Sequence, residues 1–461
     1  MAATSTNPAA KADQLRARRT QAMLEGPIGP TLAQLAAPNV LAMVVQAVVS
    51  IAEGVFASWL GLEALAGLAL VFPLVMLTQM LSAGAMGGAI SGAVARALGA
   101  GAPQRASGTA MTAWVIAAIC ALAFMGVMAV FGRPLFGVLD NSGTSVAAAM
   151  HYANVFFPGC IAIWLCHATL SVIRGTGGMG YASLALLAVS LLSIPLSGVL
   201  ALGWGGAPAL GMAGLAWGTV LAHAVVAMVA IAHVLGGRAG LSLRGARVRV
   251  AMFVDILRVG FIASLNAILT VLTIVLMVGA VGRHGADALA GYGLGARLEF
   301  LMIPVVFGIG AAMTAMVGAN IGAGQPRRAK AIAWTGSLAA AAIVGTIGMI
   351  VTLRPGLWLG IFLGPEETGA WAAGQGYFHT VAPFYAFFAI GLAMYFASQG
   401  AGRMMVPFIG SVLRICVAFG GVLLLAQVTD WGVNGVFRSI AAGMLVYGGF
   451  ITVALWRVRW G

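Results

Sequence analysis

Residues 99–106 read Gly-Ala-Gly-Ala-Pro-Gln-Arg-Ala, and residues 322–329 read Gly-Ala-Gly-Gln-Pro-Arg-Arg-Ala. Further segments pair in the same order at nearly the same spacing. They are 63–68 with 287–292, Pro158 with Pro383, 174–177 with 399–402, and 211–214 with 432–435. Matches at one spacing and in one order indicate an internal duplication. The chain is therefore expected to consist of two homologous halves.

The chain that carries these repeats is too apolar for a water-soluble domain. Of its 461 residues, 61% are hydrophobic and 8% are charged, and the mean hydropathy is +1.02. Soluble domains carry about a quarter charged residues. The composition excludes an ordinary soluble enzyme and a disordered chain, and it indicates a helical membrane protein with many spans.

Stretches without Asp, Glu, Lys or Arg mark the spans, because charges are costly in hydrocarbon. They cover 26–52, 64–95, 106–132, 141–173, 175–237, 259–282, 300–326, 331–353, 368–402, 415–429 and 439–456. The run 175–237 is long enough for two helices, with a turn at 203–208 that contains Gly and Pro. The runs that begin at 300, 415 and 439 extend backwards through Arg297, Arg414 and Arg438. We therefore predict twelve spans.

The fold class predicted from these spans is an all-α polytopic membrane protein. The expected parts are a basic tail (1–25), an N-lobe (26–235), a linker (236–250) and a C-lobe (251–461), with six transmembrane helices in each lobe. Because six is even, both halves start on the same side. The lobes are then related by a pseudo-two-fold axis along the membrane normal, as in carriers that rock between two states.

Basic residues gather on one predicted side of the membrane. Of the 24 Lys and Arg residues, those outside the spans lie on the side of the two termini, except Arg133, Arg283 and Arg354. The acids on the opposite side are Glu63, Asp140, Asp287, Glu366, Glu367 and Asp430. This positive-inside bias predicts that both termini are cytoplasmic. The net charge of +13 therefore reflects topology and attraction to lipid headgroups, and we expect no nucleic-acid partner.

Three segments resemble a known family. They are Leu35-Ala36-Ala37-Pro38, the run 60–67 followed by Phe72-Pro73, and the two Gly-Ala-Gly turns. Together with the duplication they resemble the multidrug and toxic compound extrusion (MATE) family, and within it the bacterial DNA-damage-inducible (DinF-like) branch. The resemblance implies secondary active efflux of organic, often cationic, small molecules. It further implies that proton or sodium entry drives the efflux across the bacterial inner membrane, without another cofactor. A two-lobe carrier can work as a monomer in principle, which is the expected state.

Glu53 is the predicted coupling residue. It lies about two turns before the expected outer end of the first span, where low dielectric favours the neutral carboxyl group. An acid inside a span indicates function by default, although a structural hydrogen bond is the alternative. The resemblance places an Asp of the DinF-like branch at this point. The duplicate position holds Met277, so coupling is expected in the N-lobe alone.

Neighbours of this carboxyl group are expected in spans 4 to 6. Span 5 offers Ser190 and Ser193 but no acid, which departs from the Asn and Asp of the DinF-like branch. A sodium ion prefers several oxygen ligands, so a proton is the favoured coupling ion. His167 and His223 could relay protons, but a lone histidine is more often simply hydrogen-bonded. No metal site is expected.

A second charged site is expected in the C-lobe. Glu299 and Arg297 lie two residues apart and so do not face each other on a helix. Glu299 either attracts a cationic substrate or forms an ion pair that fixes the helices. Tyr292, Tyr385 and Phe384 either line an aromatic cavity suited to cations or pack between helices.

Rival functions remain open. One rival is an exporter of lipid-linked saccharides from the wider superfamily to which the resemblance points, and another is an exporter of one dedicated metabolite. The resemblance implies a more cationic cavity for the saccharide exporters, whose cargo carries phosphates, and only Arg297, Arg414 and Arg438 could contribute to one here. An enzyme needs a nucleophile with a base, or a metal constellation, and the sequence contains neither Gly-x-Ser-x-Gly nor His-Glu-x-x-His. A channel needs a selectivity filter or a ring of charge, which we do not find.

Overall fold

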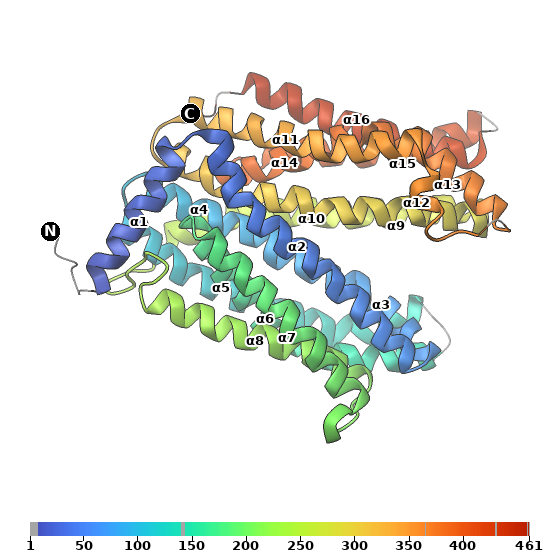
Figure 1. Ribbon diagram of the computed structural model, residues 1–461, viewed down its shortest axis with the longest axis horizontal. Coiled ribbons are helices and arrows are strands. Elements are labelled where there is room, and N and C mark those ends of the chain that lie inside the picture. The colour runs from blue at the N-terminus through green and yellow to red at the C-terminus, as the bar shows by residue number, and fades with distance from the viewer. Residues whose placement is uncertain (1–7, 140–142, 365, 429–430, 459, 461) are drawn as a thin grey trace.

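The computed structural model describes residues 8–139, 143–364, 366–428, 431–458 and 460, and they form helices joined by loops (Figure 1). Among these residues, twelve helical segments are long and apolar enough to cross a membrane, as the charge-free runs predicted. The first six are α2 (Ile28–Trp59), α3 with η1 and α4 (Leu62–Gly99), α5 (Pro103–Leu139), α6 (Thr144–Gly175), α7 (Met179–Leu202) and α8 (Met212–Leu235). The second six are α9 (Val250–Gly282), α10 (Ala286–Gly322), α11 (Pro326–Leu353), α13 with η3 and α14 (Thr368–Ala401), α15 (Met405–Val428) and α16 (Gly432–Arg457).

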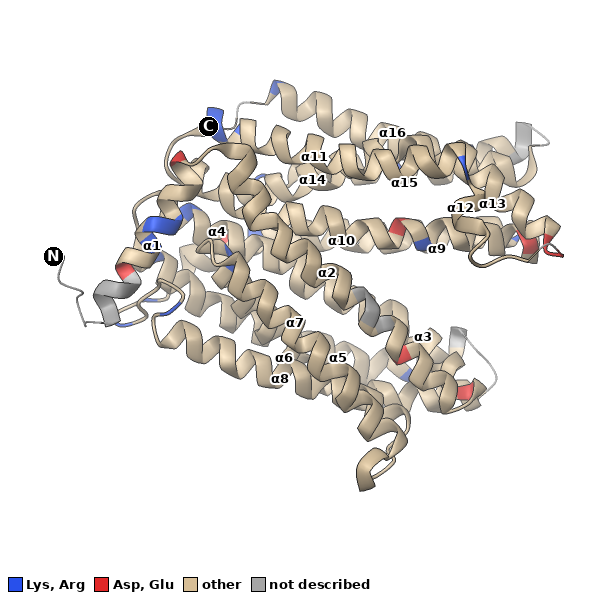
Figure 2. Cartoon of the chain, in the orientation of Figure 1, with Lys and Arg blue, Asp and Glu red and all other residues tan. Residues whose placement is uncertain are grey.

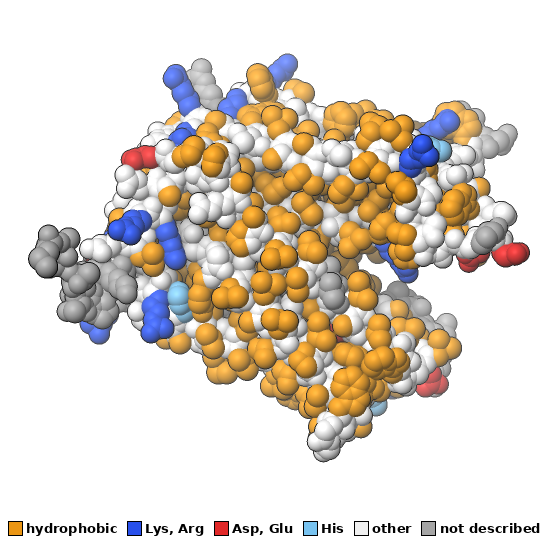
Figure 3. All heavy atoms as spheres, in the orientation of Figure 1, with side chains coloured by type: hydrophobic (Ala, Val, Ile, Leu, Met, Phe, Trp, Pro, Cys, Tyr) orange, Lys and Arg blue, Asp and Glu red, His pale blue; other side chains and the backbone are white. Residues whose placement is uncertain are grey.

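The two halves form two lobes that meet at one end of the molecule and diverge at the other (Figure 1). The N-lobe comprises α2–α8 and the C-lobe α9–α16, with the short α12 (Gly356–Leu359) in the C-lobe. The space-filling view shows a notch between the lobes at the end far from the termini (Figure 3). We call this the open end, and the end that carries α1 (Pro8–Glu25) the basic end, because Lys and Arg gather there (Figure 2).

The open end carries acids as well as Arg133, Arg283 and Arg354. Glu63 and Asp287 lie in the first turns of α3 and α10, where a carboxylate is favourable at a helix N-terminus. Asp140 and Asp430, two further acids expected on this side, lie outside the described residues.

Glycines bring the lobes into contact at the basic end. A Cβ atom at Gly99 would lie 1.9 Å from the carbonyl oxygen of Ala319, and one at Gly322 would lie 2.1 Å from that of Arg96. Gly99 and Gly322 are the first residues of the duplicated stretches, so the contact between α4 and α10 is made twice by equivalent positions. Small residues allow such backbone-to-backbone approach of membrane helices.

Arg96 fastens this contact. Its Nη1 donates hydrogen bonds to the carbonyl oxygens of Gln399 and Gly400 at 3.2 and 2.9 Å, near the end of α14. Its Nη2 lies 2.8 Å from Oδ1 of Asp255 on α9. One N-lobe side chain therefore binds two C-lobe helices, and the guanidinium is paired as a charge near a membrane requires.

The segment expected as a basic tail is helical where it is described. In α1, Met23 is 1% exposed, and its carbonyl oxygen accepts a hydrogen bond of 3.0 Å from Nδ2 of Asn320 in the C-lobe. Arg328 of the C-lobe also donates to the carbonyl oxygen of Gly26. Met23 lies next to Gly177 of the N-lobe as well, so this helix touches both lobes at the basic end.

Arg174 lies in the last turn of a span. The sequence places it between spans 4 and 5, but α6 continues through Gly175, and Arg174 is only 3% exposed. The predicted end of the span differs because a charge-free run ends at the first charge, whereas the helix continues past it.

The close approach of α4 and α10 can be tested with Gly99→Val. The added side chain must push the helices apart, because the carbonyl oxygen of Ala319 cannot rotate away. We expect the basic end to loosen. In a background without the native cysteines, Thr314→Cys should then react severalfold faster with a maleimide, since Thr314 lies between the lobes.

Gly126→Val is the matched control, because nothing lies within 4 Å of a Cβ atom at that position in α5. This control should leave the labelling rate unchanged. Equal labelling rates for Gly99→Val and the parent protein would show that the glycine contact does not close the basic end.

Candidate functional site

Glu53 lies inside the N-lobe, where three helices meet. It is partly exposed on α2, and its Oε1 accepts a hydrogen bond of 2.5 Å from Oγ1 of Thr219 on α8. The hydroxyl of Ser193 on α7 lies 3.2 Å from the same Thr219 oxygen. Because the single hydroxyl proton of Thr219 goes to Glu53, Ser193 is the donor to Thr219. The three side chains form one hydrogen-bonded set, which we call the Glu53 triad.

The Glu53 triad can hold a proton without losing its hydrogen bonds. A carboxylate only accepts, whereas a protonated carboxyl group donates through one oxygen, and hydroxyl groups do both. When Glu53 carries a proton, it can donate to Thr219, which can then donate to Ser193. Both protonation states are therefore satisfied by turning two hydroxyl groups.

Ser190 lies outside the triad. Its hydroxyl donates to the carbonyl oxygen of Leu186 in its own helix at 3.2 Å. Serine in a helix commonly bonds in this way to the preceding turn. Of the two span-5 serines proposed from the sequence, Ser193 is the one that meets the carboxyl group through a neighbour.

The two buried histidines lie together next to the triad. The rings of His167 on α6 and His223 on α8 are 5.5 Å apart and nearly perpendicular. Nδ1 of His223 bonds the carbonyl oxygen of Thr219 at 2.8 Å, so this nitrogen carries the proton. Nδ1 of His167 lies 2.8 Å from Oγ of Ser82, which itself donates to Thr78. Both Nδ1 atoms are therefore donors, and both Nε2 atoms are buried without a partner.

A π-helix places Ser82 against His167. The second span is α3 (Leu62–Gln79), the π-helix η1 (Met80–Met86) and α4 (Gly87–Gly99). Such a π-helical segment inside a span is frequent at functional sites. His223 reaches the Glu53 triad through the backbone carbonyl group of Thr219, and the described residues show no continuous chain of side-chain hydrogen bonds between the histidines and Glu53.

Sequence reasoning missed Thr219. Its signal was its spacing, since Thr219 and His223 are four residues apart and therefore share one face of α8. A hydroxyl group among apolar residues is too common to single out without knowing which helix faces Glu53.

The second acid, Glu299, lies in an aromatic cluster of the C-lobe. The hydroxyl group of Tyr377 on α13 (Thr368–Val381) donates to Glu299, and the ring of Tyr292 lies 5.6 Å from that of Tyr377. Tyr385 on α14 (Tyr385–Ala401) is buried as well. Arg414 lies 5.3 Å from the ring centre of Tyr447. Tyr377, which the sequence analysis did not select, is the direct partner of Glu299.

Arg297 and Phe384 lie apart from these bonds. Arg297 is exposed, 5.8 Å from the ring centre of Phe362, and it lines a groove with Leu294 and Leu363. Its position agrees with the expectation that it does not face Glu299. Phe384 ends the short 3₁₀ turn η3 (Ala382–Phe384) and packs against Phe387, with ring centres 6.3 Å apart.

The comparisons with known proteins agree with this architecture. The family model MatE matches residues 38–199 and 262–420, one segment in each half. The chain belongs to the MATE family. It is therefore a multi-pass membrane transporter whose matched segments repeat the duplication read from the sequence. The assignment to the DinF-like branch stays a prediction.

Three similar proteins place this MATE chain among its relatives. It is 25% identical over 313 residues to a protein of Shewanella oneidensis described as "FAD transporter", covering 67% of this chain and 68% of that one. It is 25% identical over 395 residues to "Probable multidrug resistance protein NorM" of Thermotoga maritima, covering 84% and 83%. A solved outward-facing MATE transporter matches with a TM-score of 0.86 at 24% identity, over 95% of this chain and 99% of that one.

Thr219→Val tests the Glu53 triad. The substitution keeps the shape of the side chain and removes the donor, so a partly buried carboxyl group loses its partner. A hydrogen bond to a charged group contributes about 1.5–3 kcal/mol, and we expect that loss in the free energy of unfolding. Thr219→Ser should recover most of it, as measured by thermal unfolding of the purified protein.

The control is Thr109→Val, because the hydroxyl group of Thr109 donates to the carbonyl oxygen of Arg105 in its own helix. Its cost should stay below about 1 kcal/mol. If Thr219→Val and Thr109→Val melt alike, the bond between Thr219 and Glu53 contributes nothing special.

Proposed function

We propose that this MATE protein is a secondary active exporter of organic, often cationic, compounds, and that it exchanges them for protons bound at Glu53. The observation that carries the proposal is the Glu53 triad, an acid inside the membrane that can hold or release a proton while it stays hydrogen-bonded. In the C-lobe the duplicate position is Met277, which is 3% exposed and cannot ionise.

The proposed cycle uses the two ends in turn. With the notch open as in Figure 3, a proton enters from the open end and neutralises Glu53. Rocking of the lobes then closes the open end and separates α4 from α10 at the basic end. The proton leaves, and an organic compound enters the space between the lobes. We place the basic end in the cytoplasm of a bacterial cell, from the positive-inside bias.

Protons are favoured over sodium because the triad offers only one carboxylate, and its two hydroxyl groups are a thin addition for a metal ion. A proton needs only the carboxylate, whereas a bare cation prefers several oxygen ligands. His167 and His223 lie one step from the triad through the backbone of Thr219 and are the proposed next proton acceptors. The protein is proposed to work as a monomer, since each chain carries both lobes.

The experiment uses inside-out membrane vesicles with an acidic lumen. Addition of ethidium, an organic cation, should release lumenal protons from vesicles that contain the wild-type protein, as read with a pH-sensitive dye. Glu53→Gln should abolish the release at equal expression, because the amide cannot bind the proton. Glu63→Gln is the matched control, since Glu63 is exposed in the first turn of α3 and should leave the flux unchanged.

The outcomes separate the readings. Full proton flux in Glu53→Gln would show that the coupling site is another acid, and Glu299→Gln is then the next variant to test. Flux that requires sodium in the wild type would overturn the choice of ion. No flux with any organic cation would favour export of one dedicated metabolite or of a lipid-linked saccharide. The similarity to a protein described as "FAD transporter" makes FAD the first metabolite to test in the same vesicles.

A further inference from the structure

Arg174 lies at the basic-end half of the N-lobe with no partner for most of its guanidinium. It is 3% exposed, and its Nε and Nη2 atoms are buried without a hydrogen-bond partner. Among the described residues, the ion pairs join Arg16 to Asp13, and Arg96 and Arg105 to Asp255, so none includes Arg174. A buried, unpaired cation costs several kcal/mol. Such a group calls for a ligand of opposite charge.

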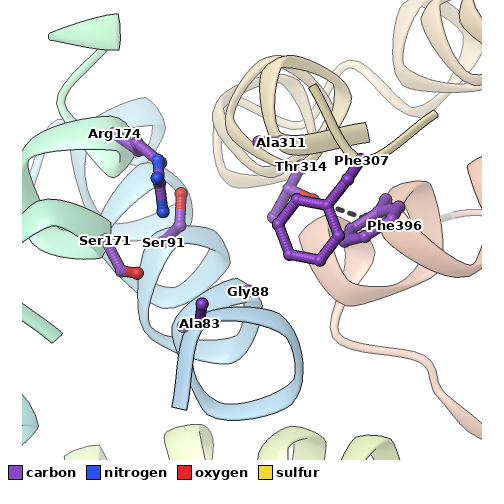
Figure 4. A pocket seen from close by; sticks show the side chains of 10 residues that line it. Ala83, Gly88, Ser91, Ser171, Arg174, Phe307, Ala311, Thr314 and Phe396 are labelled. Carbon is purple, nitrogen blue, oxygen red and sulfur yellow. Dashed lines mark hydrogen bonds between the residues drawn. The ribbon is translucent and has the colours of Figure 1, made fainter. Parts of the chain in front are cut away.

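Arg174 lines a cavity between the two lobes. In Figure 4, Arg174, Ser171 and Ser91 lie on one side of it, while Phe307 and Phe396 lie on the other. The hydroxyl groups of Ser91 and Ser171 are also buried without a partner. Three polar side chains with unused hydrogen-bonding capacity thus share one wall. The opposite wall is aromatic, with the two rings 4.8 Å apart.

The duplication shows that this polarity is particular to the N-lobe. The lining residues are equivalent pairs at the spacings of the sequence repeat: Gly88 with Ala311, Ser91 with Thr314, and Ser171 with Phe396. Thr314 is satisfied, since it donates to the carbonyl oxygen of Phe396 at 2.9 Å. Ser91, which occupies the duplicate position of Thr314, has no hydrogen-bond partner for its buried hydroxyl group. The cavity therefore lies across the pseudo-two-fold axis with a polar and an apolar half.

Gln399 is the duplicate of Arg174 and shows what a lobe-closing residue does at this position. Its Nε2 donates to the carbonyl oxygens of Gly84 and Ala85 in the N-lobe, at 3.1 and 3.3 Å. No hydrogen bond of the described residues joins Arg174 to the C-lobe in the same way. Arg174 therefore does not join the lobes as its duplicate Gln399 does.

We propose that Arg174, with Ser91 and Ser171, binds the acidic group of an organic molecule whose apolar body lies against Phe307 and Phe396. A guanidinium binds carboxylate and phosphate oxygens in a bidentate manner, and two hydroxyl groups supply further donors. In the present state the cavity has room for about one water molecule, so the ligand enters when the lobes separate at the basic end. The proposal rests on the proposed export function and adds that acidic or zwitterionic organic compounds are among its cargo.

Two pairs of fluorescent probes test this site by equilibrium binding to the purified full-length protein. The first pair is a rhodamine with a free benzoate and the methyl ester of the same dye. The second is riboflavin phosphate and riboflavin. Wild-type protein should bind the acidic member of at least one pair more tightly than its partner. The pair that responds distinguishes a carboxylate from a phosphate as the preferred group.

Arg174→Gln should weaken binding of the preferred acidic probe about tenfold or more, because a charge-assisted contact is lost. Binding of its ester or unphosphorylated partner should change less than about twofold. Arg174→Lys should recover part of the affinity. Arg457→Gln removes an equal charge from the exposed last turn of α16 and should change neither probe.

Ser171→Ala keeps the proposal testable if Arg174→Gln does not fold, and it should weaken the acidic probe severalfold. The proposal is overturned if wild-type protein does not prefer either acidic probe. An equal loss of both members of a pair in the Arg174 and Ser171 variants would overturn it as well. Because binding is measured without a gradient, a failure of proton exchange at Glu53 would not affect this result.

Discussion

The arrangement of the lobes depends on the backbone contact between α4 and α10. At Gly99 and Gly322, a hydrogen atom stands where any other residue would place a carbon atom inside a neighbouring carbonyl group. That approach brings Arg96 within reach of the carbonyl oxygens at the end of α14. The polar bonds between the lobes at the basic end therefore depend on the absence of a side chain at these two glycines. Beyond this contact the lobes diverge (Figure 1).

Because the lobes touch at one end only, Glu53 and Arg174 of the N-lobe differ in their access to solvent. Glu53, near the end of α2 at the open end, remains partly exposed, while Arg174 is enclosed beside the contact. A rocking motion that separates α4 from α10 would reverse the difference. The same motion would thus expose the Arg174 cavity to one side of the membrane and withdraw Glu53 from the other.

The spans could be predicted from sequence because exclusion of charge from hydrocarbon acts on each segment by itself. The site could be predicted only in part. Glu53 was found because an acid in an apolar run is rare, but its partner Thr219 lies 166 residues away on another helix. Tyr377 was missed for the same reason, being separated by 78 residues from Glu299. Arg174 was placed between two spans because a charge-free run ends at the first charge, whereas α6 continues through Gly175.

Duplication explains the architecture, and departures from it indicate where the chemistry lies. Equivalent glycines make the contact between the lobes twice. The closed basic end therefore requires both halves to be alike at this position. Glu53 has no acidic counterpart, since Met277 occupies its duplicate position, and Arg174 corresponds to Gln399, whose Nε2 donates hydrogen bonds to the N-lobe. A carrier built of two equal halves would bind its cargo and its ion symmetrically across the axis. The bonds that close the basic end come from Arg96 of the N-lobe and Gln399 of the C-lobe, so closure is carried by residues other than Glu53 and Arg174.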